Sequence, residues 1–228
     1  MTRLPRLCPA EVPVHVMHRG HDRKICFVCD DDYLSYLSLL SEGALFYGVE
    51  IHSWVLMTNH IHILATPKSD NSISRLMQHV GGHYVRYFNR MYLRTGTLWE
   101  GRFKSCLVED ETCFLVCQRY IELNPVRANI VEDPGGYRWS SYRANALGKV
   151  SNIISPHKIY TSLGATPTER MSSYRKLCSE VLDSEVLDDL RKATQRGLAF
   201  GGNRFKDQIE ATFGRRVRPE KPGRKTKH

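Results

Sequence analysis

Two histidines one residue apart, His60 and His62, have the types and the spacing to do chemistry. They lie in the apolar run MTNHIHIL, residues 57–64. Alternate residues of a β-strand project to the same face, so a strand here would place both imidazoles side by side. Two neutral imidazoles held in this way can bind a divalent metal ion or contact the phosphates of a nucleic acid. Packed core histidines could show the same spacing, so other residues must decide between these interpretations.

A tyrosine and an asparagine further along the chain could complete such a site. Tyr120 and Asn124, in the sequence QRYIELN, are four residues apart and would lie one turn apart on one face of a helix. An amide oxygen is a hard, neutral ligand, and two histidines, one amide and water suit Mg²⁺ or Mn²⁺. A tyrosine hydroxyl beside that ion could attack a phosphodiester. Taken singly, Tyr120 could be a half-buried helix residue and Asn124 a cap before Pro125.

The surrounding segments predict an α+β fold that would position these residues. Alternating and helical apolar patterns give the order strand, helix, strand, strand, helix, strand, helix, at residues 12–20, 30–48, 49–57, 60–67, 70–96, 98–110 and 111–124. This order is that of a ferredoxin-like or RRM-like antiparallel sheet with helices on one face. We expect Ile61, Ile63 and Val55 to pack under those helices, which leaves His60 and His62 on the open face.

The rest of the chain has a different composition. Residues 149–214 contain several short segments that begin with Ser, Thr or Asn, the residues preferred at helix N-caps, and these predict short helices. We therefore expect a helical extension that could also bind DNA. Residues 1–148 would then form the first domain. The last 14 residues, 215–228, hold seven Lys or Arg against one Glu, and so carry six of the nine net positive charges. A basic tail with Pro and Gly favours a flexible arm for an anionic partner such as nucleic acid.

The bulk composition agrees with a globular protein. The chain has 228 residues, 41% hydrophobic and 25% charged, and no apolar run approaches the roughly 18 residues that a membrane span needs. The N-terminus lacks the apolar block of a signal peptide. We therefore expect a cytoplasmic protein, and the seven cysteines are then expected to be reduced thiols.

Three ordered motifs resemble a known family: NHIHIL, the stretch GGHYVRYFNRMYLRTGTLWEGRFKS at 81–105, and YIELNPVRANIV at 120–131. Over about residues 12–145 the chain resembles the single-tyrosine HUH transposases of the IS200-like kind. Its closest resemblance is to the REP-associated tyrosine transposases of bacteria.

The resemblance implies a fold, an activity and a set of roles. His60 and His62 would bind the metal ion, Asn124 would supply the third ligand, and Tyr120 would be the nucleophile. The family nicks single-stranded DNA at hairpin-forming palindromic repeats, forms a 5′-phosphotyrosine and rejoins strands by reversing that step. The resemblance implies Mg²⁺ or Mn²⁺ as the cofactor, single-stranded DNA as the partner, a monomer with a dimer left open, and a nucleoid-associated location in the cytoplasm.

Basic residues near these motifs could neutralise DNA phosphates. The candidates are Arg19, Arg23, Lys24, Arg86, Arg90, Arg102, Lys104 and Arg127. Trp99 and Phe103 could stack on unpaired bases, and could equally be core residues.

Alternatives remain for both the nucleophile and the function. Tyr84, Tyr87 and Tyr92 compete with Tyr120, but none of them has Asn or Gln four residues later. A non-catalytic DNA- or RNA-binding regulator could use the same RRM-like sheet. A metallohydrolase is disfavoured because the His-x-His strand is not followed by a further Asp-His pair.

Overall fold

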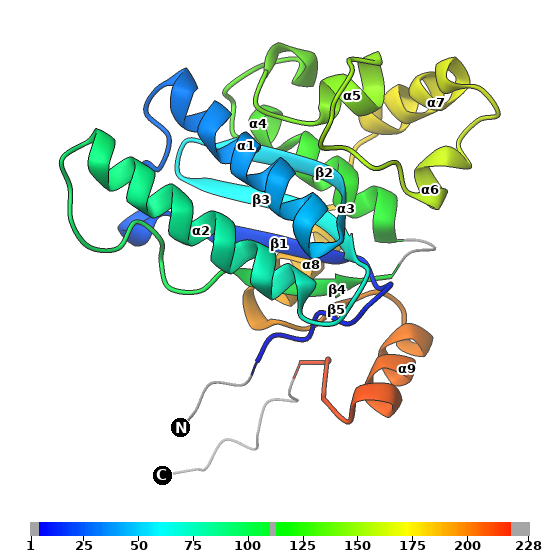
Figure 1. The fold of residues 1–228 in the computed structure, drawn as a ribbon. Coiled ribbons are helices and arrows are strands. Elements are labelled where there is room, and N and C mark those ends of the chain that lie inside the picture. Colours follow the sequence, from blue (N-terminus) through cyan, green and yellow to red (C-terminus); the bar gives the residue numbers. More distant parts are fainter. Residues whose placement is uncertain (1–4, 110–112, 220–228) are drawn as a thin grey trace, which may run out of the picture.

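The computed structural model describes residues 5–109 and 113–219, and these form a five-stranded sheet in the order β2-β3-β1-β4-β5 (Figure 1). The first four strands pair antiparallel in the strand order of the ferredoxin-like fold. The sequence prediction of an α+β, ferredoxin-like fold is therefore confirmed. Its elements are β1 (Val14–Arg19), α1 (Asp30–Tyr47), β2 (Val49–Met57), β3 (His60–Pro67), α2 (Ser72–Met91) and β4 (Lys104–Val108).

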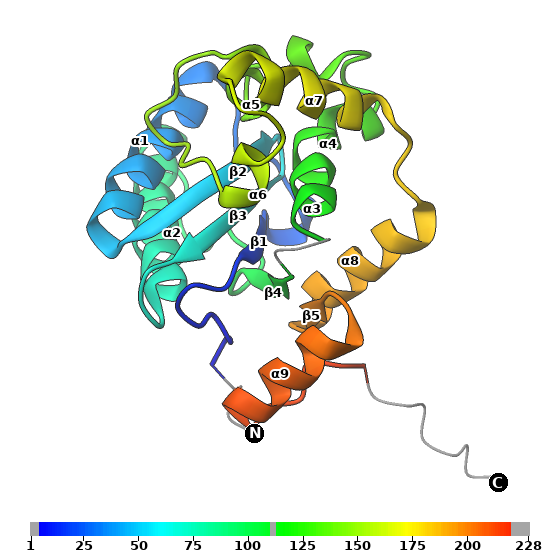
Figure 2. The ribbon, with the colours of Figure 1, turned by 90° about the vertical axis from the view of Figure 1, so that its right-hand side faces the viewer.

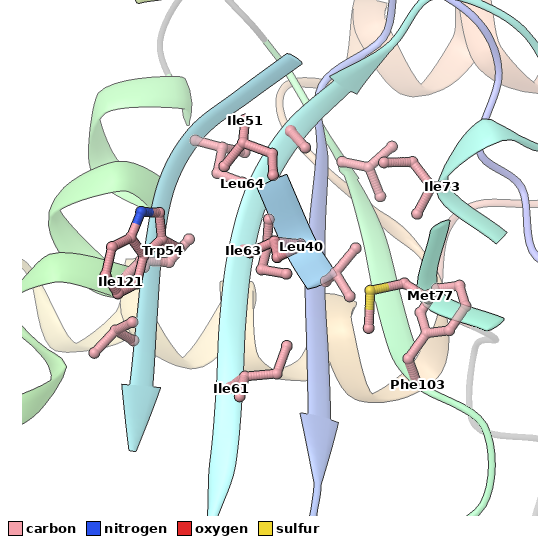
Figure 3. Close-up of a cluster of buried hydrophobic side chains, with 14 of the residues drawn as sticks. Leu40, Ile51, Trp54, Ile61, Ile63, Leu64, Ile73, Met77, Phe103 and Ile121 are labelled. Carbon is pink, nitrogen blue, oxygen red and sulfur yellow. The ribbon is translucent and has the colours of Figure 1, made fainter. Parts of the chain in front are cut away.

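Helices α1 and α2 pack together and cover one face of the sheet. Ile61 and Ile63 of β3 are buried in the same hydrophobic cluster as Leu40 of α1 and Met77 of α2 (Figure 3). All four lose nearly all contact with solvent, and burial of one such side chain contributes about 1.5–3 kcal/mol. The apolar alternation of β3 thus anchors the strand, and it forces His60 and His62 to the other face.

The histidine face is covered as well, by α3 (Cys113–Glu122) and α8 (Ser184–Arg196). Helix α3 contacts β2, β3 and β4, and α8 contacts β1, β4 and β5. Figure 2 shows α1 and α2 on one side of the sheet and α3 and α8 on the other. The face that the sequence prediction left open is therefore a second packed layer. Val55 belongs to this layer, contrary to expectation, because its register places it opposite His62.

The C-terminal extension is helical, as predicted, and it also completes the sheet. Helices α4 (Asn124–Arg127) and α5 (Tyr142–Leu147) precede it, and the extension itself contains α6 (Lys158–Thr161), α7 (Pro167–Ser179), α8, β5 (Ala199–Phe200) and α9 (Asn203–Phe213). The two residues of β5 pair parallel with β4, and the sequence prediction missed this strand. Residues 220–228 of the predicted basic tail lie outside the described residues. Within the described part, no helix is long and apolar enough to span a bilayer.

A buried carboxyl group ties α3 to the extension. Glu122 is fully buried, and it accepts hydrogen bonds from Ser141 Oγ at 2.5 Å, Asn145 Nδ2 at 2.7 Å and Tyr174 Oη at 2.6 Å. These donors come from the N-terminus of α5, from α5 itself and from α7. Glu122 lies two residues after Tyr120, so this network holds the end of the tyrosine helix in place.

The turn after β1 is tight and approaches the start of β3. The Gly20 N–H donates to the Asn59 carbonyl at 2.8 Å. A Cβ atom on Gly20 would lie 2.2 Å from the Lys24 carbonyl oxygen, closer than any side chain tolerates. This position therefore requires glycine, and the close approach keeps Arg19 and His60 in register at one end of the sheet.

Candidate active site

His60 and His62 lie on one face of β3, as the alternation predicts. Their ring centroids are 5.1 Å apart and the rings are perpendicular. The antiparallel register places Arg19 opposite His60 and Met17 opposite His62, so alternate residues of β1 extend the same face. His60 is half-buried, and His62 is only 5% exposed because α3 and α8 cover it.

Each histidine uses its Nδ1 atom in a hydrogen bond within the protein. His60 Nδ1 lies 2.6 Å from Asn59 Oδ1, and His62 Nδ1 lies 2.8 Å from His15 Nε2. Burial, assisted by the charge of Arg19, lowers the pKa of His60 to about 4. Burial and the neighbouring His15 and His60 lower the pKa of His62 well below its usual value. Both imidazoles are thus neutral at physiological pH, which is the form that binds metal ions.

Tyr120 and Asn124 reach the same pocket from the end of α3 and the start of α4. The pocket has a volume of about 300 Å³, and its walls include His60, His62, Tyr120 and Asn124. The ring centroids of Tyr120 and His62 are 5.6 Å apart, edge to face. The predicted single helix ends at Glu122, and a new turn of helix begins at Asn124, next to Pro125. Proline has no N–H to donate back to the preceding turn, which explains this break.

Arginines surround the tyrosine. The guanidinium carbon of Arg127 lies 4.4 Å from the centre of the Tyr120 ring, and Arg127 also donates to the Tyr120 backbone carbonyl. Burial lowers the pKa of Arg127 to about 10, so it remains a cation at neutral pH. The guanidinium carbon of Arg191 of α8 lies 5.9 Å from the centre of the Tyr120 ring, and Arg19 lines the same pocket. Such a cluster suits a phosphate group, whose oxygens accept paired donors from guanidinium groups.

Two contributions to this pocket were not predicted from the sequence. His15 of β1 is 1% exposed and contacts His62, and helix α8 supplies Arg191, Thr194 and Gln195 to the wall. The alternation of VHVMHR places His15 and Arg19 on one face and was the available signal for His15. No local pattern in α8 could have shown its residues to be near His62, about 130 residues earlier in the chain.

The donor set fits a hard divalent ion. Within residues 5–109 and 113–219, no group of three or more His, Cys, Asp and Glu side chains is placed to hold a metal ion. An ion in this pocket would instead be held by two imidazoles and the Asn124 amide oxygen, with water completing its coordination. A neutral set of two nitrogens and oxygens is compatible with Mg²⁺ or Mn²⁺.

Comparison with known proteins identifies the family of the chain. The model of the family described as "Transposase IS200 like" matches residues 10–124, which is half of the chain. The chain belongs to the IS200-like transposase family. The predicted resemblance to this family is therefore confirmed. No match was found among curated proteins.

The fold of this transposase is also found among solved structures. The structure of a REP-associated tyrosine transposase bound to a REP hairpin matches with a TM-score of 0.55 and 16% identity, covering 69% of this chain and 93% of the other. A putative transposase from Deinococcus radiodurans is 19% identical over 54% of this chain and 93% of its own, with a TM-score of 0.37. The first of these supports the fold assignment.

The other tyrosines of the transposase lie away from the pocket. Tyr84 is fully buried and donates to the Cys26 carbonyl at 2.6 Å, and burial raises its pKa far above the usual value. Tyr92 donates to Asp32 at 2.8 Å, and its pKa is likewise raised, mainly by burial. Neither these two nor Tyr87 lines the pocket that holds His60 and His62. Of these four tyrosines, Tyr120 is therefore the one that lines the pocket.

The predicted DNA-binding residues fall into separate groups. Arg19 and Arg127 line the tyrosine pocket, and Lys104 at the start of β4 donates to Gln195. Arg86 and Arg102 line a different groove of about 840 Å³ beside α2. Arg23, Lys24 and Arg90 are exposed elsewhere. Their contacts with DNA stay a prediction.

The two aromatic residues near Arg102 are core residues. Trp99 is 5% exposed and stacks on His18 with ring centroids 4.3 Å apart, and Phe103 is 7% exposed beneath the Arg6 guanidinium. Of the two interpretations of Trp99 and Phe103, packing is therefore the one that the structure favours.

Proposed function

We propose that this transposase nicks single-stranded DNA and transfers the strand through a 5′-phosphotyrosine at Tyr120. The observation that carries the proposal is the placement of the Tyr120 ring 5.6 Å from that of His62, in a pocket that also contains His60, Asn124 and three arginines. A hydroxyl nucleophile, candidate metal ligands and cations for a phosphate thus meet in one place. The substrate we propose is a hairpin-forming palindromic repeat, as in the REP-hairpin complex of the similar structure.

The metal ion would be Mg²⁺ or Mn²⁺, held by His60, His62 and Asn124. When bound, it would polarise a non-bridging oxygen of the phosphodiester. Burial of the two imidazoles keeps them neutral, and their Nδ1 hydrogen bonds hold the rings in fixed orientations. The chain's own contribution to metal binding is therefore a preorganised pair of ligands.

The chemical step that we propose is a transesterification. The Tyr120 oxygen forms a bond to phosphorus, the bond from phosphorus to the 3′ oxygen breaks, and that oxygen leaves as a 3′-hydroxyl after gaining a proton. The phenolic proton is lost in the attack, so protons balance over the step. Religation reverses it, with the 3′-hydroxyl of a strand attacking the phosphotyrosine. The bond energy is conserved in the intermediate, so no nucleotide cofactor is consumed.

Arg127 and Arg191 would act on the charge that develops in this step. Both guanidinium groups lie against the Tyr120 ring, where they can donate hydrogen bonds to the non-bridging phosphate oxygens. Positive charge placed before the reaction costs no reorganisation when the pentavalent state forms. Arg19 extends the same cationic wall toward the strand that enters the pocket.

A covalent adduct tests this function. The full chain is incubated with Mn²⁺ or Mg²⁺ and a panel of end-labelled hairpin oligonucleotides made from repeats of the source genome, and is then analysed on a denaturing gel. The proposal expects a protein–DNA band for the wild type and for Tyr87→Phe, and none for Tyr120→Phe. Cleaved DNA without an adduct would indicate a hydrolase. Binding without cleavage across the panel would indicate the regulator, and an adduct with Tyr120→Phe would exclude Tyr120.

A further inference from the structure

A chain of three hydrogen bonds connects helix α8 to His62. His62 Nδ1 lies 2.8 Å from His15 Nε2, and His15 Nδ1 lies 2.9 Å from Thr194 Oγ1. Thr194 Oγ1 in turn donates to the Leu190 carbonyl at 2.8 Å. His62, His15 and Thr194 are each at most 5% exposed, so water does not compete for these atoms. This series of hydrogen bonds therefore begins at a backbone carbonyl of α8 and ends at a candidate metal ligand.

The direction of each bond in this chain follows from the backbone carbonyl. The Leu190 carbonyl can only accept, so it takes the single proton of the Thr194 hydroxyl. Thr194 must then accept from His15, which places the proton of the neutral His15 ring on Nδ1 and leaves Nε2 as an acceptor. His62 consequently donates from Nδ1. Its own Nε2 then carries a lone pair and no proton, which is the state that a metal ligand needs.

His60 reaches the same tautomer through a different partner. Its Nδ1 lies 2.6 Å from Asn59 Oδ1, an atom that can only accept. The orientation of that amide is fixed because Asn59 Nδ2 donates to the Arg23 carbonyl at 3.1 Å. Both histidines therefore carry the proton on Nδ1 and the lone pair on Nε2. Two independent networks that produce one tautomer indicate that the tautomer itself matters at this pocket.

His15 is a partner of His62 and is not itself placed as a ligand. Both of its ring nitrogens are occupied, by His62 and by Thr194. The Cys106 thiol also lies beside it, with Sγ 4.0 Å from His15 Nδ1 and 3.3 Å from Thr194 Oγ1. The thiol is a weaker and more distant acceptor than the hydroxyl. Thr194 is thus the group that decides on which nitrogen His15 carries its proton.

We infer that His15 and Thr194 are positioning residues that set the tautomer of His62, and that helix α8 is thereby part of the active site. This inference rests on the proposed metal-dependent function. It assigns a role to a helix that lies beyond the residues 10–124 matched by the family model. Without the Thr194 hydroxyl, a proton on His15 Nδ1 would be a buried donor that lacks this acceptor. The tautomer of His15 with its proton on Nε2, which donates to His62, is then favoured. The His62 proton would then move to Nε2, where it blocks the ligand position.

The test compares Thr194→Val with Thr194→Ser in the full chain. Valine has nearly the shape of threonine but no acceptor, whereas serine keeps the hydroxyl. Mn²⁺ affinity, measured by titration calorimetry or by the electron paramagnetic resonance of free Mn²⁺, should fall on the order of 10-fold for valine and stay within about 3-fold for serine. A Thr194→Val, Cys106→Ala double variant should lose more, because it also removes the weak acceptor. Equal Mn²⁺ affinity in wild type and Thr194→Val would overturn the inference.

A second measurement keeps the inference testable if the valine variant does not fold. Nitrogen-15 NMR of the imidazole rings in metal-free wild type reports which nitrogen of His62 and of His15 carries the proton. The inference expects Nδ1 in both, and a proton on Nε2 of His62 would contradict it. Failure of the proposed function would give a different result. If no DNA adduct forms while His62 keeps this tautomer and the protein binds Mn²⁺, the strand-transfer proposal is wrong and the positioning role of His15 and Thr194 is retained. Wild type that binds no Mn²⁺ would overturn the positioning role.

Discussion

The buried Glu122 should make the transposase less stable as the pH rises through neutrality. Burial, the largest influence, raises the pKa of Glu122 from 4.5 to about 7, against the opposing effect of hydrogen bonds from Ser141, Tyr174 and Asn145. A carboxyl group whose pKa is raised by folding stabilises the fold fully below its unfolded pKa, and this stabilisation is lost as the pH rises through the folded pKa. The loss therefore falls between about pH 4.5 and somewhat above pH 7.

The size of this effect follows from the shift. One pKa unit corresponds to about 1.4 kcal/mol, so a change from 4.5 to about 7 is equivalent to about 3 kcal/mol in total. Most of it, about 2–3 kcal/mol, should be lost between pH 5 and pH 8. Glu122→Gln removes the titration and keeps the shape. Its amide oxygen can still accept from Ser141 and Asn145, and its amide nitrogen can donate to the Tyr174 hydroxyl, which is able to accept.

The assay is urea unfolding of wild type and of Glu122→Gln at several pH values from 5 to 8. The free energy of unfolding of the wild type, relative to that of the variant, should decrease by about 2–3 kcal/mol over this range. Glu132→Gln serves as the control, because it makes the same change of charge at an exposed position and should leave the pH profile unchanged. A flat difference between wild type and Glu122→Gln, or one that grows with pH, would refute the reasoning.

Three further variants test the geometry of the site. Gly20→Ala should lower the free energy of unfolding by about 1–3 kcal/mol, because its Cβ atom would lie 2.2 Å from a backbone carbonyl oxygen. The control is Gly82→Ala in α2, whose Cβ atom would meet only the end of the Arg86 side chain at 3.8 Å and which should not lower stability. Thermal unfolding measures both variants, and equal melting temperatures for the two would contradict this expectation. Arg127→Lys should slow single-turnover adduct formation on the order of 10²-fold, because one ammonium group cannot contact both Tyr120 and the phosphate as the guanidinium can. DNA affinity should stay nearly unchanged, since the positive charge is kept. An unchanged rate of adduct formation would show that Arg127 has no part in the mechanism. Asn124→Ala should weaken Mn²⁺ binding by at least about 10-fold in titration calorimetry, and wild-type affinity would show that Asn124 is not a ligand.

Local patterns were sufficient to predict the sheet and the two motifs that meet in the pocket. The alternation of β3 placed His60 and His62 on one face, and helical spacing placed Tyr120 and Asn124 one turn apart. These features depend only on the two periodicities of strand and helix, which can be read within a few residues. The strand order followed because few topologies satisfy the observed sequence of elements.

The missed features depend on contacts between distant parts of the chain. His15 can be recognised as a partner of His62 only from the register of β1 with β3, which places the two side chains next to each other. Helix α8 carries Thr194 and Arg191 to the pocket, yet its amphipathic pattern is that of many packed helices and does not identify the surface that it covers. Strand β5, with two residues, is too short to produce any alternation. The second helical layer therefore needed the tertiary structure.

Peptide mapping of the covalent adduct tests the central claim most directly. Trypsin should release residues 120–127, YIELNPVR, because Arg119 precedes Tyr120 and Arg127 closes the peptide. After nuclease trimming of an adduct formed with a hairpin oligonucleotide and Mn²⁺, mass spectrometry should find this peptide with the added mass of a 5′-linked nucleotide on Tyr120. An adduct mapped to a peptide containing Tyr84, Tyr87 or Tyr92, with residues 120–127 unmodified, would contradict the account.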